Sequence, residues 1–426
     1  MKNFKKDLQY YKFCAYGFIK NLQFFDPYLI LFFIESGIQY FQIGVLFGIR
    51  EIATNVLEIP TGVIADFFGR RKAMMAAFAA YIVSFLFFYL FSDFRMFIVA
   101  MVFFSVGEAF RTGTHKAMIL DYLKRNDMAE FKIHYYGHTR SWSQRGSALS
   151  ALIAAAIVFS FQVYRNVFLF TMIPYIFGFL LIRSYPKYLD FSSEADRKKT
   201  VETEEEQGLI SKIIIKNKAA FGRTWKDMKG LIQHRELRFL LLNSSLYDGV
   251  FKASKDYVQP VMKNLALALP VFLYFQEQRR VALVVGLLYF CIYIFTSVVS
   301  QNSGIVSDKL KSPGKGMNIS YIVTLVLLVA VGICMQYNAY LPGVLFFIGI
   351  YLMNNLRRPM TLGYVSDRIK GTVMATGLSI ESQLKTLIVA ILSPLFGAVA
   401  DGIGLGWAFA LLAVVPLLLY PLVRVR

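Results

Sequence analysis

Charged residues are scarce in this chain of 426 residues: Asp, Glu, Lys and Arg make up 17% of it, against about 25% in a typical soluble domain. Residues 281–307 and 317–356 contain none of the four. A run of about 20 apolar residues is long enough to cross the hydrocarbon core of a bilayer as a helix. The shortage of charge therefore excludes a soluble enzyme, a nucleic-acid-binding domain and a disordered tail protein.

Patterns that bind metals or catalyse reactions are also missing. The three cysteines, Cys14, Cys291 and Cys334, all lie in apolar segments and show neither metal nor disulfide spacing. His134 and His138 have the spacing of metal ligands, but no carboxylate or thiolate accompanies them, so we interpret them as a solvated pair. The sequence contains no HExxH, no GxSxG and no phosphate-binding loop. We therefore expect no enzyme activity, no metal and no cofactor.

Apolar residues dominate instead. They make up 56% of the chain, 40 residues are Phe and 25 are Tyr, and the mean hydropathy is +0.50. This composition predicts an all-α integral membrane protein, because aromatic rings face lipid and settle at the two interfaces. We expect twelve transmembrane helices at about residues 10–34, 39–66, 71–92, 94–123, 138–163, 166–184, 237–261, 279–306, 315–336, 340–366, 371–399 and 403–424.

The net charge of +19 is explained by topology. Lys and Arg gather before the first span and in alternate loops, at 70–72, 124–132 and 309–315, whereas the opposite loops hold few. Positive loops stay in the cytoplasm. We therefore predict a multi-pass protein of the cell membrane with both termini cytoplasmic, in contact with the lipid bilayer and not with nucleic acid.

One long connection divides the spans into two sets of six. It predicts an N-terminal half at 1–184, a cytoplasmic linker at 185–236 and a C-terminal half at 237–426. Within the linker, apolar residues between Ile210 and Ile232 recur at helical spacing with lysines between them. This pattern is typical of a basic amphipathic helix on the membrane surface, and we interpret it as a structural connection.

Charge within the predicted spans has a period of three helices. The first span of each group of three carries the most charge and the third carries almost none, with the second intermediate. A charge at bilayer depth costs about 2.5–3.5 kcal/mol on insertion scales unless it faces a wet cavity or a partner. The period therefore predicts two pseudo-symmetric six-helix halves around a central polar cavity.

The two halves also repeat short motifs. Arg111, Asp121 and Lys124 recur with the same spacing as Arg357, Asp367 and Lys370. The pattern Gly-x-x-x-Asp at Gly62 recurs at 304–308, and a third copy, Gly397-Ala-Val-Ala-Asp401, lies near the start of the last span. Internal repeats with a site near the membrane midplane are typical of secondary transporters.

One of these motifs carries a family resemblance. The segment Gly62-Val-Ile-Ala-Asp66-Phe-Phe-Gly69-Arg70-Arg71-Lys72 resembles the loop signature G-x-x-x-D-R-x-G-R-[KR]-x of the major facilitator superfamily. It departs at Phe67, where the signature has Arg. The phrases Glu58-Ile-Pro-Thr-Gly62 and Arg358-Pro359 resemble uncharacterised bacterial permeases near the drug:proton antiporters, although the antiporter motif R-x-x-x-G is not reproduced after Arg111.

The resemblance implies a transporter that rocks its two halves around a midplane site. It also implies a conformational latch, which we assign to Gly62, Asp66, Gly69, Arg70, Arg71 and Asp308. The alternative is a basic loop that only fixes the orientation in the membrane.

Cations outnumber acids on the charged spans. Candidate residues for binding a small-molecule substrate are Lys20, Arg111, His115, Lys252, Lys255, Arg357 and Arg358, and their charge favours an anionic or amphiphilic solute. About half of the charges are expected to form internal pairs, such as Glu108 with Arg111, and Lys252 with Asp248 or Asp256. Arg111 and Arg357 are expected to approach the cavity from its two sides.

Candidate groups for proton coupling are Asp26, Glu108 and Glu58, because a carboxylate in a low-dielectric site can load and release a proton near neutral pH. The sequence thus predicts a monomeric, proton-coupled secondary transporter. A facilitative uniporter or a multidrug effluxer of cationic compounds is the alternative. Substrate identity and the direction of transport stay open.

Overall fold

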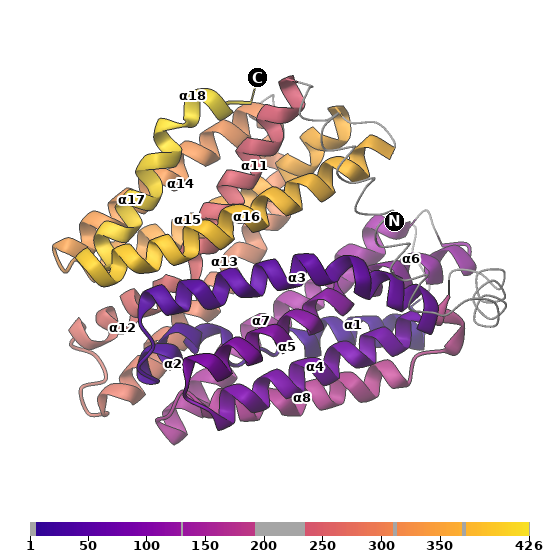
Figure 1. The fold of residues 1–426 in the computed structure, drawn as a ribbon, viewed down its shortest axis with the longest axis horizontal. Coiled ribbons are helices and arrows are strands. Elements are labelled where there is room, and N and C mark those ends of the chain that lie inside the picture. The colour runs from indigo at the N-terminus through magenta and orange to yellow at the C-terminus, as the bar shows by residue number, and fades with distance from the viewer. Residues whose placement is uncertain (1–5, 129–130, 192–234, 310–312, 369–371, 426) are drawn as a thin grey trace. The chain divides into compact units, whose positions relative to one another are not determined.

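The computed structural model describes residues 6–128, 131–191, 235–309, 313–368 and 372–425, and every regular element in these ranges is a helix (Figure 1). The first half of the chain forms α1 (Leu8–Lys20), η1 (Asp26–Tyr28), α2 (Leu29–Glu35), α3 (Tyr40–Phe68), α4 (Arg70–Leu90), α5 (Phe94–Arg111), α6 (Thr114–Arg125), α7 (Lys132–Phe161), α8 (Asn166–Arg183) and η3 (Lys187–Asp190). The second half forms α11 (Arg235–Ser254), η4 (Lys255–Tyr257), α12 (Val258–Ala268), α13 (Glu277–Lys309), α14 (Pro313–Gln336), α15 (Tyr340–Arg368), α16 (Thr372–Ile403), α17 (Leu405–Leu418) and α18 (Tyr420–Val423).

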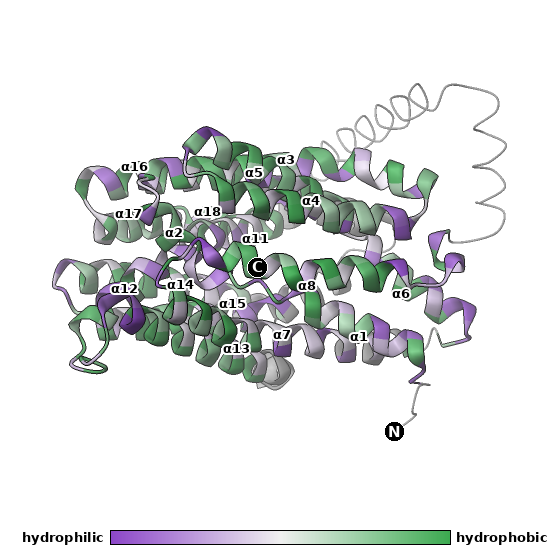
Figure 2. Ribbon diagram, turned by 90° about the horizontal axis from the view of Figure 1, so that it is seen from below, coloured by the Kyte–Doolittle hydropathy of each residue, from purple (hydrophilic) through white to green (hydrophobic). Residues whose placement is uncertain are grey.

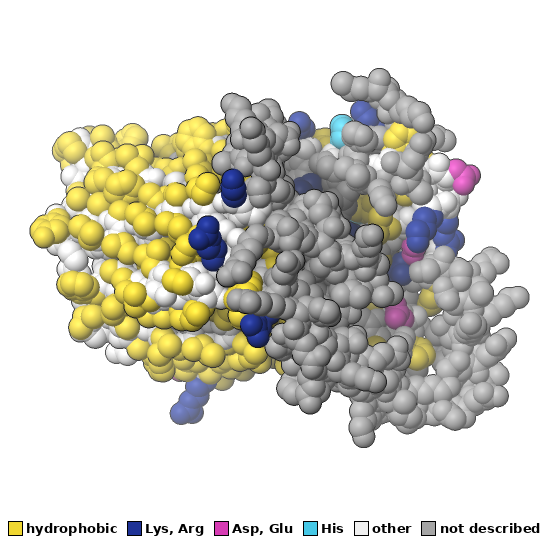
Figure 3. Space-filling model, turned by 90° about the horizontal axis from the view of Figure 1, so that it is seen from above, with side chains coloured by type: hydrophobic (Ala, Val, Ile, Leu, Met, Phe, Trp, Pro, Cys, Tyr) yellow, Lys and Arg dark blue, Asp and Glu magenta, His cyan; other side chains and the backbone are white. Residues whose placement is uncertain are grey.

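The helices follow the predicted spans closely, and seven stretches of the described chain are long and apolar enough to cross a membrane. Figure 2 shows apolar residues along most of α4, α5 and α13. The described part of the surface in Figure 3 is mostly hydrophobic, with few Lys and Arg side chains. The fold is therefore that of a helical membrane protein, while the count of twelve spans stays a prediction. The amphipathic helix expected at 210–232, within the linker at 185–236, lies outside the described residues.

Three predicted spans are interrupted where they carry charge. The span predicted at 10–34 divides into α1, η1 and α2, and the one at 237–261 divides into α11, η4 and α12. The span at 94–123 breaks between α5 and α6 at Gly113, whose φ of +79° suits a residue without Cβ. Helix ends expose backbone groups that bind polar partners. Broken helices thus place polar backbone beside the charged side chains.

The chain groups into two compact units. Unit 1 comprises Met1–Phe25, Ala53–Ser150 and Arg165–Gly222, and unit 2 comprises Asp26–Ile52, Ala151–Tyr164 and Arg223–Arg426. The units do not coincide with the two six-helix halves, because two segments of the first half pack with the second half. The division at 184 and 237 stays a prediction drawn from sequence repeats.

The core of unit 1 is aromatic. The ring of Phe168 stacks on Phe25 at 5.5 Å and on Phe88 at 4.9 Å between centroids. The ring of Tyr81 lies against Gly107, where an added Cβ would come within 2.9 Å of it. This packing fixes Tyr81 on α4 beside the end of α5, where its hydroxyl reaches Glu108.

Candidate functional site

The break after α5 holds an ion pair within unit 1. Arg111 ends α5, and its Nη2 donates to Oε2 of Glu108, one turn earlier. Its Nε lies 3.3 Å from Glu108 Oε1. The Tyr81 hydroxyl also donates to Glu108 Oε1. The side chains of Glu108 and Arg111 are 22% and 23% exposed, so both are only partly buried.

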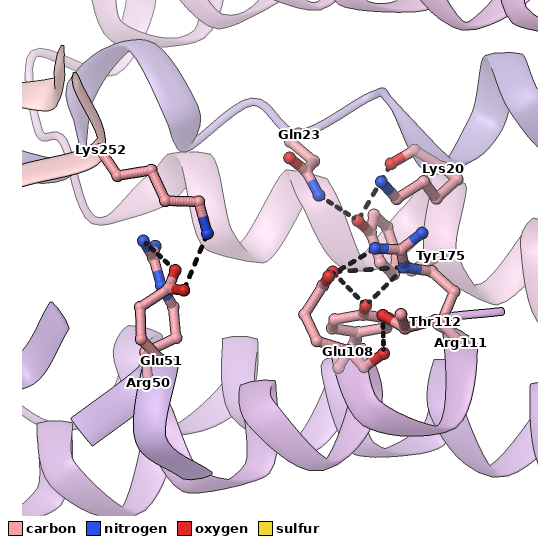
Figure 4. A network of polar contacts seen from close by, with 10 residues as sticks. Lys20, Gln23, Arg50, Glu51, Glu108, Arg111, Thr112, Tyr175 and Lys252 are labelled. Atoms are coloured by element: carbon pink, nitrogen blue, oxygen red, sulfur yellow. Dashed lines mark hydrogen bonds and ion pairs between the residues drawn. The ribbon is translucent and has the colours of Figure 1, made fainter. Parts of the chain in front are cut away.

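Three further polar residues complete this site (Figure 4). Lys20, at the end of α1, interacts electrostatically with Glu108. Its backbone oxygen accepts a hydrogen bond of 3.1 Å from Tyr175, whose hydroxyl oxygen accepts one of 2.9 Å from Gln23. We call Lys20, Gln23, Tyr81, Glu108, Arg111 and Tyr175 the Glu108 cluster. In this cluster the carboxylate of Glu108 interacts with two cations, Arg111 and Lys20.

A second cluster lies within unit 2. Lys252 on α11 donates a hydrogen bond of 2.8 Å to Glu51 on α3. Arg50 Nη2 lies 3.7 Å from the other oxygen of Glu51, and Lys385 acts on the same carboxylate electrostatically. We call Arg50, Glu51, Lys252 and Lys385 the Glu51 cluster, and Figure 4 shows the first three of them. The prediction that Lys252 pairs with Asp248 or Asp256 is wrong, because the acid that lies opposite it comes from a distant part of the chain.

A third cluster joins the broken ends of η1 and η4, also within unit 2. Lys255 forms an ion pair with Asp256 and interacts electrostatically with Asp26. The Tyr293 hydroxyl donates to Asp26 at 2.7 Å, and Gln259 donates at 2.8 Å to the backbone oxygen of Asp26. We call Asp26, Lys255, Asp256, Gln259 and Tyr293 the Asp26 cluster.

Arg357 takes a structural position. It is 2% exposed, and its guanidinium donates to Asn243 Oδ1, Ser320 Oγ and the Met317 backbone oxygen. Its Cζ lies 4.2 Å from the centre of the Tyr247 ring. The three hydrogen bonds satisfy guanidinium donors inside unit 2. They therefore give no support to the expectation that Arg357 reaches a cavity. Its neighbour Arg358 is exposed.

His115 lies among aromatic rings and outside the hydrogen bonds of the Glu108 cluster. It stacks on Tyr16 with 3.6 Å between ring centroids, and its Nε2 lies 3.3 Å from the Tyr185 hydroxyl. The side chain of Glu58, on α3, is partly exposed. Substrate binding by His115 and proton coupling by Glu58 both stay predictions.

The residues of the predicted latch bind acids from two other segments. Arg70 forms an ion pair with Asp121 on α6. The Arg71 amide donates to Asp190 Oδ1 at 3.0 Å, and Gly69, with φ of +95°, leads into α4 just before them. Asp66 is exposed, and a Cβ at Gly62 would meet nothing within 4 Å. The side chain of Asp308 lies outside the described residues, so the latch stays a prediction.

Asp190 has no predicted role in the sequence, but in the structure it is a buried titratable group. It is 8% exposed, and burial raises the pKa of its carboxyl, while the hydrogen bond from the Arg71 amide and the charge of Arg71 act in the opposite direction. Sequence reasoning placed it at the start of the linker and gave it no role. Its contact with α4 could have been suspected from Gly69, which supplies no side chain to cap that helix.

Comparison with known proteins gives the family. The sequence profile of the Major Facilitator Superfamily matches residues 13–382. An uncharacterized MFS-type transporter, YxaM of Bacillus subtilis (strain 168), is 29% identical over 90 residues, which cover 21% of this chain and 23% of that protein. The solved structure of the nucleoside transporter NupG has a TM-score of 0.71 at 10% identity, covering 98% of this chain and 96% of that one.

A POT family transporter, solved in complex with a thioalcohol-conjugated peptide, has a TM-score of 0.65 at 15% identity and covers 97% of this chain and 95% of that one. At these identities the solved structures show the fold alone, which agrees with the family profile over almost the whole length. The chain therefore belongs to the Major Facilitator Superfamily, and its described helices are those of a multi-pass membrane protein.

Proposed function

We propose that this protein is a proton-coupled secondary transporter of a small anionic solute, working by alternating access in the cell membrane. It has twelve spans and cytoplasmic termini in this proposal. One observation supports the anionic substrate above others. In the Glu108 cluster and in the Glu51 cluster, a single carboxylate is shared by two or more cations.

The charge balance gives the physical reason. In the Glu108 cluster, Lys20 and Arg111 carry two positive charges against one negative charge. In the Glu51 cluster, Arg50, Lys252 and Lys385 carry three against one. Excess charge at bilayer depth is unfavourable, and a solute with a carboxylate or phosphate group relieves it. The planar guanidinium of Arg111 suits two-point binding of such a group.

The Glu108–Arg111 pair is the feature that supports the proposed coupling to protons. A substrate anion and the Glu108 carboxylate compete for the same guanidinium. Protonation of Glu108 breaks its ion pair and leaves Arg111 ready to bind the substrate. The Tyr81 hydroxyl holds the carboxyl group in place through this exchange. Asp26, with its hydrogen bond from Tyr293, is the second candidate, and Glu58 is the third.

The alternatives make different predictions. A facilitative uniporter would carry its solute at a rate that an imposed proton gradient does not change. A multidrug effluxer would prefer cationic compounds, which the surplus of Lys and Arg in both clusters disfavours. The similar solved structures are a nucleoside transporter and a transporter bound to a peptide conjugate, and neither favours one of these alternatives over the anion proposal.

The proposal is tested in proteoliposomes with an imposed pH gradient, using a panel of organic anions and cations. Uptake of an anion should follow the gradient. Arg111→Gln should abolish this uptake. Arg111→Lys should weaken it, because an ammonium group lacks the planar pair of donors with which a guanidinium binds an anion at two points. Arg95→Gln is the matched control, because Arg95 is an exposed arginine on the same helix. Normal anion uptake by Arg111→Gln, or a preference for cations, would show that the proposal is wrong.

A further inference from the structure

Two buried asparagines of unit 2 bind the backbone of the last described residues. Asn318 on α14 makes two hydrogen bonds with one residue, Val425. Its Nδ2 donates to the Val425 oxygen at 2.6 Å, and its Oδ1 accepts from the Val425 amide at 3.0 Å. Asn243 on α11 donates from Nδ2 to the Val423 oxygen at 2.9 Å. The two side chains thus act as a neighbouring β-strand does, by pairing with the backbone groups of an extended segment.

The side chains of this segment alternate between the inside and the outside of the protein. Val423 and Val425 are 6% and 4% exposed, whereas Arg424 between them is exposed. The backbone of Arg424 is extended, with φ of −62° and ψ of 125°. Successive side chains of an extended segment point to opposite faces, so the two valines pack inward. We call residues 423–425 the end strap.

Burial of the two asparagines explains why the end strap is held in place. Asn243 is 0% exposed and Asn318 is 9% exposed. A buried amide group that loses its hydrogen-bond partner is strongly unfavourable, so both side chains favour a filled site. The ends of a folded chain are poorly ordered unless they are tied down. Backbone hydrogen bonds and two buried valines supply that tie here.

The end strap also belongs to the hydrogen-bond network of Arg357. Asn243 accepts from the Arg357 guanidinium through Oδ1 while it donates to the end strap through Nδ2. Arg357 donates to the backbone oxygen of Met317 as well, the residue before Asn318. The short helix α18, which leads into the end strap, packs against α11 (Figure 1). The end strap therefore connects α11 and α14 at the place where Arg357 of α15 binds both.

We propose that Asn243 and Asn318 form an internal peptide-binding site, whose ligand is the end strap. The ligand class is a short extended peptide with small apolar side chains at alternate positions. Recognition goes through the backbone, because the hydrogen bonds from both asparagines reach only main-chain groups of the ligand. The site therefore accepts such a peptide as a separate molecule once the chain's own copy is removed. The inference goes beyond the transport function proposed above, and its tests need no substrate.

A buried valine of the end strap reports whether the site is filled. The test uses purified protein in which Cys14, Cys291 and Cys334 are replaced by serine, with the purification tag on the N-terminal side. Val425→Cys keeps a small apolar side chain, and N-ethylmaleimide reacts with it when the end strap leaves the site. Arg424→Cys, at the exposed neighbour, is the matched control. Val425→Cys should react about tenfold more slowly than Arg424→Cys, because the hydrogen bonds favour the filled site.

Asn318→Ala should raise the labelling rate of Val425→Cys about tenfold, because the end strap loses two hydrogen bonds. The labelling rate of Arg424→Cys should stay the same. Asn264→Ala is the control for the substitution, since Asn264 is a partly exposed asparagine on α12, and it should change neither rate. Equal rates for Val425→Cys and Arg424→Cys, or an unchanged rate of Val425→Cys beside Asn318→Ala, would overturn the proposal.

A synthetic peptide tests the ligand class. Removal of residues 423–426 should lower the midpoint of thermal unfolding in detergent, and an acetylated and amidated peptide of residues 420–425 should restore it. The same peptide with an N-methyl group on the Val425 amide should not, because it cannot donate to Asn318. The peptide with Arg424→Ala should restore the midpoint fully, because that side chain faces outward.

Two outcomes of the peptide experiment would show that the proposal is wrong. One is a natural peptide that fails to raise the midpoint of the shortened chain. The other is an N-methylated peptide that raises it as much as the natural one, since recognition would then not go through the Val425 amide. If the shortened chain does not fold, the comparison of Val425→Cys with Arg424→Cys still decides, because it is made in the full chain.

Discussion

Lys252 on α11 donates a hydrogen bond of 2.8 Å to Glu51, a residue 201 positions earlier in the chain. The pair joins one predicted six-helix half to the other inside unit 2. Because Arg50 and Lys385 act on the same carboxylate, Glu51 neutralises only part of the positive charge around it. An anionic solute thus offers these cations the same kind of negatively charged oxygen atoms as the carboxylate of Glu51.

Glu51→Gln should strengthen binding of an anionic solute and weaken the fold. The cations keep their charge and lose their carboxylate, so the affinity for an anion rises several-fold. The free energy of unfolding should fall by about 1–2 kcal/mol, between the values for exposed and buried ion pairs. Uptake kinetics and thermal unfolding in detergent measure the two effects. Glu277→Gln, at an exposed glutamate, is the control, and weaker anion binding by Glu51→Gln would contradict the charge argument.

Glu108→Gln should remove the pH dependence of transport while leaving substrate binding measurable. The amide imitates the protonated acid, and its oxygen still accepts from Tyr81 and Arg111, so the fold is kept. Uptake rates between pH 5.5 and pH 8.5 make the comparison with the natural protein. If the dependence of uptake rate on pH keeps its shape, the proton-coupling group is Asp26 or Glu58. The variants Asp26→Asn and Glu58→Gln then test these two residues.

Arg357→Gln should lower stability strongly, and Arg358→Gln should not. Removal of the Arg357 guanidinium leaves its buried acceptors Asn243 and Ser320 without their donor, and each such loss costs about 1–3 kcal/mol. The adjacent Arg358 is exposed. The fraction of monodisperse protein after heating in detergent measures both variants. Equal stability of the two would show that Arg357 is not a structural residue.

Asp190→Ala should destabilise the start of α4 by about 1 kcal/mol, because the Arg71 amide loses its acceptor. Asp190→Asn keeps an oxygen at the same place and should be milder. Burial raises the pKa of Asp190 in the folded state. The protonated acid is then favoured by folding, and this contribution is present below the unfolded pKa and lost as pH rises through the raised value.

The pH dependence supplies the measurement for this residue. The stability of the natural protein relative to Asp190→Asn should fall as the pH rises through the raised pKa of Asp190, and thermal unfolding over a pH series detects it. A constant difference across the series would show that the Asp190 carboxyl titrates alike in the folded and unfolded chain.

The sequence by itself determined the family, the helical fold and the approximate position of most of the long helices. These follow from apolar run length and from the motif beginning at Gly62, and both are local properties of the chain. The Glu108–Arg111 pair was also predictable, because residues one turn apart on a helix share a face. The breaks at Gly113 and before η1 were not predicted, since a run of apolar residues indicates a span but not where its hydrogen bonds stop.

Only the tertiary structure decided which distant charges meet. Lys252 finds Glu51 and not the acids of its own helix, Asp401 caps α3, and Arg357 is buried among polar groups instead of reaching a cavity. Such partners are set by how helices cross, and helix crossings depend on close contacts at single glycines such as Gly44. Spacing along the sequence carries no information about contacts between residues hundreds of positions apart, so these pairings had to come from the folded chain.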